Sequence, residues 1–287
     1  VYTTHFSDAW RYRRLMELME KEKLSADDHW AATTDIKNLL AQEMRPGLVA
    51  ILQRDARLAP LAELLESWDL EDDKDAAAPM VFQFVLRNLV AETFADDMDE
   101  DLLKEYLNNQ YYWKERFLVL YQRNDGNWFD ASRTDPRESR DEMVLRAGRI
   151  ALDELSSQWG DDPGNWHWGD AHSVTFFHPF VPGKDAAEWV GGGVHRFDGS
   201  SETLRRGFYL FGDNNFEARS IDSLRLLMDL SDSDKVEAHF PGGVSERWFD
   251  RWNMNFLEAW LNNEKRYWWF SDKAIAENTD TELLLQP

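Results

Sequence analysis

The sequence predicts an α+β chain with a helical first half, a strand-rich second half and a closing helix. Up to residue 160, apolar residues recur at three- and four-residue spacing behind Ser, Asp or Pro residues, which is typical of amphipathic helices. After Gly160, short alternations of Trp, His, Val, Thr and Phe favour strands. We expect residues 1–160 to form a mainly helical part and residues 161–287 a strand-rich part of one continuous structural unit.

Individual helices in the first half can be located by their start signals. Ser25 followed by two acidic residues indicates a helix N-cap. Pro46 is expected near the start of a second helix, because proline is tolerated in the first turn. Residues 79–94 are predicted as an amphipathic helix, and residues 139–159 as a long helix that begins at Ser139.

The second half predicts strands and one further helix. Residues 166–180 carry the residue types of strands, and residues 224–230 form a short apolar run that ends at a Ser-Asp-Ser-Asp segment. Residues 247–262 place Trp248, Trp252, Phe256 and Trp260 four residues apart, which predicts a closing helix.

Charge and composition exclude several classes of protein. The chain has 32 Lys and Arg against 54 Asp and Glu, and its net charge of -22 repels nucleic acids and anionic membranes. It contains no cysteine, which excludes disulfides, Cys-ligated zinc and thiol chemistry. No run of residues is apolar enough for a membrane span. An acidic, Lys-poor composition is typical of proteins from salty environments, and a merely acidic protein is an equal alternative.

The histidines suggest a metal site that their spacing does not support. His167, His172 and His178 lie close together in the sequence with Asp170. No pair of them has the one-turn or strand-alternating spacing of a metal signature. We therefore expect structural hydrogen bonding, a buried His172 and no metal.

Tryptophans and one serine offer weaker candidates. Trp166 with Trp168, and Trp268 with Trp269, suit stacking on sugars, although core packing is the commoner use of tryptophan. Residues 243–247 begin like a nucleophile elbow, but Arg247 stands where the second glycine belongs, so Ser245 is not expected to be a nucleophile.

Three arginines interrupt the acidic sequence near its start. Arg11 and Arg14 are three residues apart and share a helix face, whereas Arg13 does not. An inward arginine can hold a carboxylate of a substrate or of the protein itself. Spacing alone favours the structural alternative.

Several motifs, taken in order, resemble the β-chain of the penicillin acylase family, whose members are amidohydrolases with an N-terminal nucleophile. The first half contributes RYRRLMELMEKEKLSADD at 11–28, LAELLESWD at 61–69, NWFD at 127–130 and ESRDEM at 138–143. The second half contributes NWHWGDAH at 165–172, HPF at 178–180, SLRLLMDLSD at 223–232, FPGGVS at 240–245 and the closing segment RWFDRWNMNFLEAWLNNE. The resemblance covers nearly the whole chain and implies the C-terminal portion of an αββα fold of the N-terminal-nucleophile hydrolases.

The resemblance implies hydrolysis of the amide bond of N-acyl substrates of β-lactam or acyl-homoserine lactone type. In that family a β-chain N-terminal serine attacks the amide carbonyl, and a backbone N–H and an Asn amide stabilise the oxyanion. An Arg beyond that Asn lies at the rim of the site, and Arg11 is its best match here, with slippage to Arg13 as the alternative. The implied partners are the acylase α-chain and the N-terminal part of the β-chain, and the implied location is periplasmic or secreted.

The chain departs from the family pattern at the nucleophile. Residue 1 is Val, and no Asn precedes Arg11. We therefore expect this chain alone to be inactive, as part of a complete enzyme or, alternatively, as a non-catalytic partner module that keeps the fold. The resemblance leaves calcium open as a cofactor of the complete family enzyme, but the family's calcium ligands lie mostly outside this segment and the one nearby acid, Asp8, is not assigned. No cofactor is therefore expected in this chain.

Overall fold

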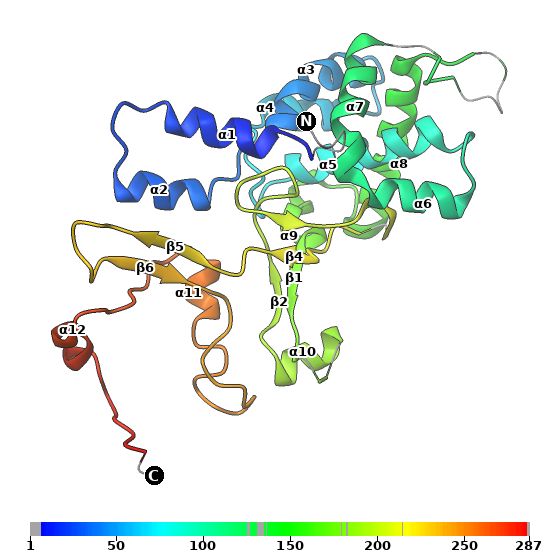
Figure 1. Cartoon of the computed structure of the whole chain (residues 1–287). Helices are drawn as coiled ribbons and strands as arrows, with labels where there is room; N and C mark the ends of the chain where they lie inside the picture. The colour runs from blue at the N-terminus through cyan, green and yellow to red at the C-terminus, as the bar shows by residue number, and fades with distance from the viewer. Residues whose placement is uncertain are drawn as a thin grey trace. The chain divides into compact units, whose positions relative to one another are not determined.

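Figure 1 shows a computed structural model that describes residues 7–124, 127–130, 135, 137–178, 180–181, 183–213 and 215–285. The chain divides into two compact units, and each draws on segments from both sides of residue 160. The first unit takes Val1–Glu20, Asp35–Val174 and His195–Ile221, and the second takes Lys21–Thr34, Thr175–Val194 and Asp222–Pro287.

The first unit is built mainly of helices. These are α1 (Trp10–Met19), α3 (Leu39–Leu52), α4 (Ala59–Ser67), α5 (Ala78–Phe94), α6 (Glu100–Asn108), α7 (Gln110–Arg123), α8 (Arg140–Trp159) and the short α9 (Trp168–Ala171). Two 3-10 turns, η1 (Pro163–Asn165) and η2 (Phe211–Asp213), and the strand pair β3 (Gly207–Phe208) and β4 (Ser220–Ile221) complete it.

Helix α5 forms the centre of this unit. It packs against α4, α6 and α8 (Figure 1), and its side chains are buried on every face. The prediction of a helix over these residues is confirmed, but the prediction that it is amphipathic is wrong. A helix covered by neighbours all round needs apolar residues all round, and the polar Gln83, Arg87 and Asn88 are buried with the rest.

Capping explains where several helices begin. Ser25 and Ser139 each accept a hydrogen bond from the backbone of the third helical residue, and the acidic side chain there bonds back in a capping box. The Asp99 carboxylate similarly accepts from Leu102 N at the start of α6. These observations confirm the predicted starts at Ser25 and Ser139.

The second unit contains small elements. Helices α2 (Ala26–Thr33), α10 (Lys184–Val190), α11 (Leu257–Leu261) and α12 (Asp272–Glu277) accompany an antiparallel hairpin of β5 (Arg225–Met228) and β6 (Val236–His239). The strand predicted at 224–230 is thereby confirmed. Outside the hairpin, Tyr267 bridges to Glu237. Strands β1 (Ser173–Phe176) and β2 (Gly193–Arg196) pair with each other, and each has residues in both units.

Three further expectations need correction. Pro46 lies inside α3, not at its start, because Asn38 caps the helix by accepting from Ala41 N. Among the described residues of the predicted strand segment 166–180, Trp168–Ala171 is helical and Ser173–Phe176 is the one strand. Of the predicted closing helix 247–262, the segment Leu257–Leu261 is helical and the residues before it are not.

Local hydrogen bonds account for the missing part of that helix. The Ser245 hydroxyl donates to the Asp250 carboxylate at 2.9 Å, and the Asn253 amide donates to the Ser245 carbonyl at 2.9 Å. Side chains of Ser, Asp and Asn compete with helical hydrogen bonds in this way. The residues before Leu257 therefore form turns, and the side chains of Trp248 and Phe249 are exposed.

Candidate functional site

Helix α1 carries the arginine that the sequence singles out. Arg11 is half-buried, and its Nε donates to the Thr203 carbonyl at 3.0 Å. Trp10 anchors the helix, because its side chain is buried and its indole N–H donates to Glu43 at 3.2 Å. The guanidinium of Arg11 is thus held by a backbone carbonyl from a loop distant in the sequence, while α1 is fixed to the core beside it.

The two neighbouring arginines make different contacts. Arg13 is exposed and pairs with Glu43 at 2.6 Å. Arg14 forms a two-pronged contact with Asp35, whose carboxylate oxygens lie 2.8–3.2 Å from its Nε and Nη2. The Asp35 hydrogen bond is the main cause that raises the pKa of Arg14. Arg14 therefore ties α1 to Asp35, and Arg11 donates to a backbone carbonyl.

The loop that holds Arg11, residues 198–206, is polar and largely buried. Gly199 adopts φ +84°, and a Cβ there would lie 2.0 Å from the Arg205 carbonyl. The Thr203 hydroxyl accepts from Ser200 N at 2.8 Å and donates to the Arg205 carbonyl at 2.6 Å. These bonds within the loop fix the Thr203 carbonyl that receives Arg11.

Glu202, the residue beside Thr203, anchors the loop in the core. Its carboxylate is fully buried and pairs with the buried ammonium of Lys114 on α7. It also accepts from Gln83 at 3.2 Å, from the Ser200 hydroxyl at 3.1 Å and from the Tyr209 hydroxyl at 3.3 Å. Buried charges persist when they are paired and hydrogen-bonded, and Glu202 meets both conditions.

A second buried carboxyl, Asp72, lies in the same electrostatic environment. Burial, and then the charge of Glu202, raise the pKa of Asp72 to about 8, although Asn38 donates to its Oδ2 at 2.9 Å. Its Oδ1 has no hydrogen-bond partner among the described residues. At neutral pH this carboxyl is therefore mostly protonated, and Lys114 forms its ion pair with Glu202.

Asp8 and Arg206 complete the polar surroundings of Arg11. Burial, and then Glu202, raise the pKa of Asp8 to about 6. Burial, and then the positive charge of Arg11, lower the pKa of Arg206 to about 10. The Arg206 guanidinium lies 4.8 Å from the ring centres of both Tyr111 and Phe208. Two guanidinium groups and a readily protonated carboxyl therefore surround the Arg11 end of α1, an arrangement suited to binding and orienting an anion or a carbonyl oxygen.

The three sequence-predicted histidines make hydrogen bonds instead of a cluster. His172 is buried, its Nδ1 lies 2.6 Å from the Phe216 carbonyl, and its ring stacks on Trp168 at 4.7 Å. Burial lowers the pKa of His172 to about 4. This confirms the prediction of a buried, hydrogen-bonded His172. His167 Nδ1 lies 3.0 Å from the Asp75 carbonyl, and His178 Nδ1 accepts from Phe180 N at 3.3 Å.

The other predicted candidates, a metal site and the two tryptophan pairs, were also located in the structure. Throughout the part of the chain that the structure describes, no three His, Asp or Glu side chains gather as metal ligands. Trp166 and Trp168 are core residues whose indoles donate to the carbonyls of Gly160 and Gly199, both at 2.8 Å. Trp268 and Trp269 are exposed.

Comparison with known proteins identifies the family of this chain. The family model described as Penicillin amidase matches residues 1–277. The chain belongs to the penicillin amidase family. Acyl-homoserine lactone acylases QuiP of Pseudomonas fluorescens (strain Pf0-1) and of Pseudomonas putida (strain KT2440) are each 21% identical, over 92% and 91% of this chain and 34% of their own length. This penicillin amidase family chain therefore spans about a third of the length of the curated relatives it matches.

A solved structure shares the fold of this penicillin amidase family member. The thermostable penicillin G acylase from Alcaligenes faecalis matches 100% of this chain and 54% of its own, with a TM-score of 0.54 and 14% identity. The mixed helix-and-strand fold predicted from the family resemblance is confirmed. No helix among the described residues is both long and apolar enough to cross a membrane.

Sequence reasoning missed the residues that support Arg11. Lys114 and Glu202 are 88 positions apart, and neither lies in a recognisable motif. The available signal was the FDGSSET run at 197–203, in which Gly and Ser residues indicate a turn. Nothing in that run indicates that the turn is buried.

Proposed function

We propose that this chain is part of a penicillin acylase-like hydrolase that cleaves the amide bond of N-acyl substrates, of β-lactam side-chain or acyl-homoserine lactone type. The single observation that supports it most is the family match across residues 1–277. The names of the relatives, acyl-homoserine lactone acylase and penicillin G acylase, both describe hydrolysis of an acyl amide.

In this proposal Arg11 is a positioning residue at the rim of the reaction centre. Its Nε bond to the Thr203 carbonyl fixes the plane of the guanidinium, and the terminal nitrogens then orient the oxyanion-stabilising Asn or the substrate. A fixed donor stabilises developing charge more than a mobile one, because it needs no reorganisation during the reaction. The ion pair of Lys114 with Glu202 supports this fixation from the core.

The nucleophile comes from outside residues 1–287 in this proposal. We propose that the acylase α-chain and the N-terminal part of the β-chain supply the serine, its α-amine base and the oxyanion Asn. The share of 34% of the relatives' length supports this view. A periplasmic or secreted location is part of the same proposal and follows the family resemblance.

Hydrolysis assays on two preparations test the proposal. The complete protein, with its upstream segments, and residues 1–287 alone are each incubated with a chromogenic phenylacetyl anilide and with N-acyl-homoserine lactones, and the released amines are quantified by mass spectrometry. We expect turnover of at least one substrate by the complete protein and none by residues 1–287. Turnover by residues 1–287 alone, or none by the complete protein on any of these amides, would contradict the proposal.

A further inference from the structure

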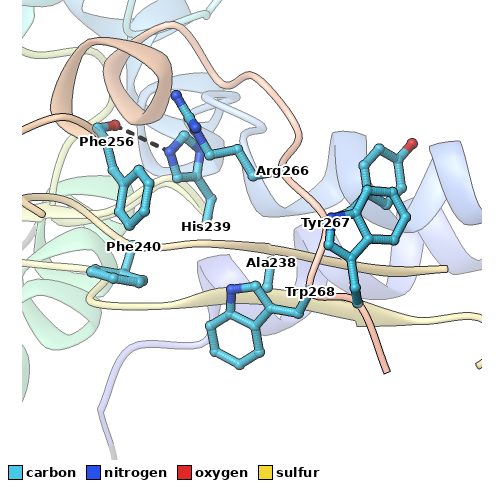
Figure 2. A pocket seen from close by; sticks show the side chains of 8 residues that line it. Ala238, His239, Phe240, Phe256, Arg266, Tyr267 and Trp268 are labelled. Atoms are coloured by element: carbon cyan, nitrogen blue, oxygen red, sulfur yellow. Dashed lines mark hydrogen bonds between the residues drawn. The ribbon is translucent and has the colours of Figure 1, made fainter. Parts of the chain in front are cut away.

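The second unit contains a pocket that the proposed acylase chemistry does not use. Its volume is about 260 Å³, and its walls come from β6, from the residue before α11 and from residues 266–269 (Figure 2). The lining is aromatic apart from Ala238, His239 and Arg266. Among the described residues, no carboxylate side chain lines it, so the lining itself does not repel an anionic ligand.

The aromatic walls hold one another in place. The rings of Phe240 and Phe256 meet edge-to-face at 5.1 Å. Tyr267 stacks on Trp269 at 5.5 Å, and Trp268 N donates to the Val236 carbonyl, which ties this segment to β6. The side chains of Tyr267, Trp268 and Trp269 are 41–46% exposed. Within residues 7–285 the pocket therefore presents a preformed aromatic surface that suits a flat apolar ligand.

Arg266 supplies the charge of the pocket. Its guanidinium carbon lies 4.9 Å from the centre of the Phe256 ring, and Arg266 takes part in no ion pair among the described residues. The adjacent cation, Lys265, is instead bound by Asp27 and Glu237. The two neighbouring cations thus differ in their partners. Lys265 pairs with two carboxylates of the protein, whereas the Arg266 guanidinium lies over the Phe256 ring. The N–H groups of Arg266 can therefore bind the carboxylate of a ligand.

His239 links two backbone segments that border the pocket. Its two ring nitrogens lie 2.8 Å from the Glu264 carbonyl and 3.1 Å from the Phe256 carbonyl, as the dashed line to Phe256 in Figure 2 marks. Burial is the main cause that lowers the pKa of His239, and the charges of Arg266 and Arg225 lower it further. The ring therefore lies between the backbone carbonyls of Glu264 and Phe256 and connects the two chain segments that border the pocket.

We propose that this pocket binds a planar aromatic carboxylate of one or two rings. The carboxylate pairs with the Arg266 guanidinium, and the ring system lies against Phe256, Phe240 and Trp268. A neutral saccharide would use the exposed tryptophans but not the guanidinium, and the volume of about 260 Å³ suits a ligand of roughly a dozen heavy atoms. Binding at this site does not depend on amide hydrolysis, so the proposal stands apart from the proposed acylase function.

Calorimetric titration of the complete protein with 2-naphthoate tests the proposal, because this ligand contains no amide bond. Its neutral isostere 2-naphthamide, and glucose, are titrated in parallel. We expect saturable binding of 2-naphthoate, with 2-naphthamide at least about tenfold weaker, since the amide lacks the negative charge that pairs with the Arg266 guanidinium. Equal binding of the amide, binding of glucose alone, or binding of none of the three would overturn the proposal.

Variants locate the binding. Arg266→Gln is expected to weaken 2-naphthoate at least about tenfold, and Arg266→Lys should recover only part of the loss because it lacks the planar fork. Arg251→Gln is the matched control, since Arg251 also lies on a ring, 4.3 Å from Trp252, but does not line the pocket. Thermal unfolding confirms that each variant folds. Unchanged affinity in Arg266→Gln, or an equal loss in Arg251→Gln, would place the ligand elsewhere and refute the assignment.

Discussion

The ammonium of Lys114 and the carboxylate of Glu202 form an ion pair that is almost completely shielded from water, with 2% and 0% of the side chains exposed. The pair joins α7 to the loop of residues 198–206 and lies next to the residue whose carbonyl receives Arg11. Isolated buried charges are costly, and this pair persists because Gln83, Ser200 and Tyr209 also donate to Glu202.

Removing the cation of this pair should destabilise the protein strongly. In Lys114→Met the Glu202 carboxylate loses its counter-charge but stays buried, and we expect a loss of about 3–5 kcal/mol in the free energy of unfolding. Urea denaturation monitored by circular dichroism measures it. Lys104→Met is the control, because the Lys104 side chain is 59% exposed and its carboxylate partner is 4.0 Å away. Equal losses in the two variants would show that burial of the pair is not what matters.

The double variant Lys114→Met/Glu202→Gln separates charge from packing. Glu202→Gln removes the uncompensated charge while it keeps the size of the side chain. We expect the double variant to be more stable than the sum of the two single losses indicates, with a coupling of at least about 1 kcal/mol. Strict additivity would mean that the two side chains do not interact.

Asp72 should make stability fall as the pH rises. Its pKa is raised from 3.8 in the unfolded chain to about 8 in the folded protein. Between these two values the folded state holds a proton that the unfolded state has lost. The contribution of Asp72 to the free energy of unfolding is therefore complete below about pH 4 and disappears towards pH 8. The slope approaches about 1.4 kcal/mol per pH unit where only the folded carboxyl is protonated.

His172 changes the stability in the opposite direction over part of this pH range. Its pKa is lowered from 6.5 to about 4, so stability from this residue rises between pH 4 and 6.5 and opposes the Asp72 term there. We therefore expect the effect of Asp72 to be clearest from pH 6.5 to 8. The comparison of wild type with Asp72→Asn by urea denaturation at several pH values measures it. The variant should lose the decline in this range, and parallel curves would contradict the assignment.

Local signals in the sequence predicted the helices of the first unit well and its buried polar loop poorly. Ser25 and Ser139 could be recognised as caps because a capping box lies within four residues. Pro46 led to a wrong helix start, because proline is commoner in the first turn than in the middle of a helix such as α3. The partners of Glu202 come from residues far apart in the chain, and no local pattern encodes such a meeting.

The arginine face of α1 shows what spacing can and cannot predict. Three-residue spacing correctly separated Arg11 and Arg14 from the exposed Arg13. It did not indicate that Arg14 would be held by Asp35 and Arg11 by a backbone carbonyl. Which arginine serves catalysis stays a prediction.

Gly207 should not tolerate a side chain. A Cβ at this position would lie 2.3 Å from His172 Nε2. The imidazole cannot easily move away, because it is fully buried and stacked on Trp168. We expect Gly207→Ala to cost about 1–3 kcal/mol in the free energy of unfolding, as overpacking in a core does. Gly164→Ala is the control, since its Cβ would meet only the Asp162 carboxylate at 3.2 Å. A Gly207→Ala protein as stable as this control would show that the core can rearrange there.

Arg11 should matter for catalysis in the complete acylase more than Arg13. Arg11 is half-buried and fixed by the Thr203 carbonyl, whereas Arg13 is exposed and pairs with Glu43. A preorganised donor near the oxyanion stabilises the transition state by about 2–4 kcal/mol. We expect Arg11→Ala to lower kcat/KM by a factor of about 30–1000 and Arg13→Ala to stay near wild type, in steady-state kinetics on a chromogenic acyl anilide.

Two further measurements separate a positioning role of Arg11 from a merely structural one. Arg11→Lys keeps the charge but not the planar fork, so it should recover little activity. The loss should appear mainly in kcat, since an interaction made in the transition state affects the chemical step more than ground-state binding. Thermal unfolding of Arg11→Ala should meanwhile stay close to that of Arg13→Ala. If Arg13→Ala lost more than about tenfold in kcat/KM while Arg11→Ala kept its activity, the family arginine would have to be matched to the neighbouring position.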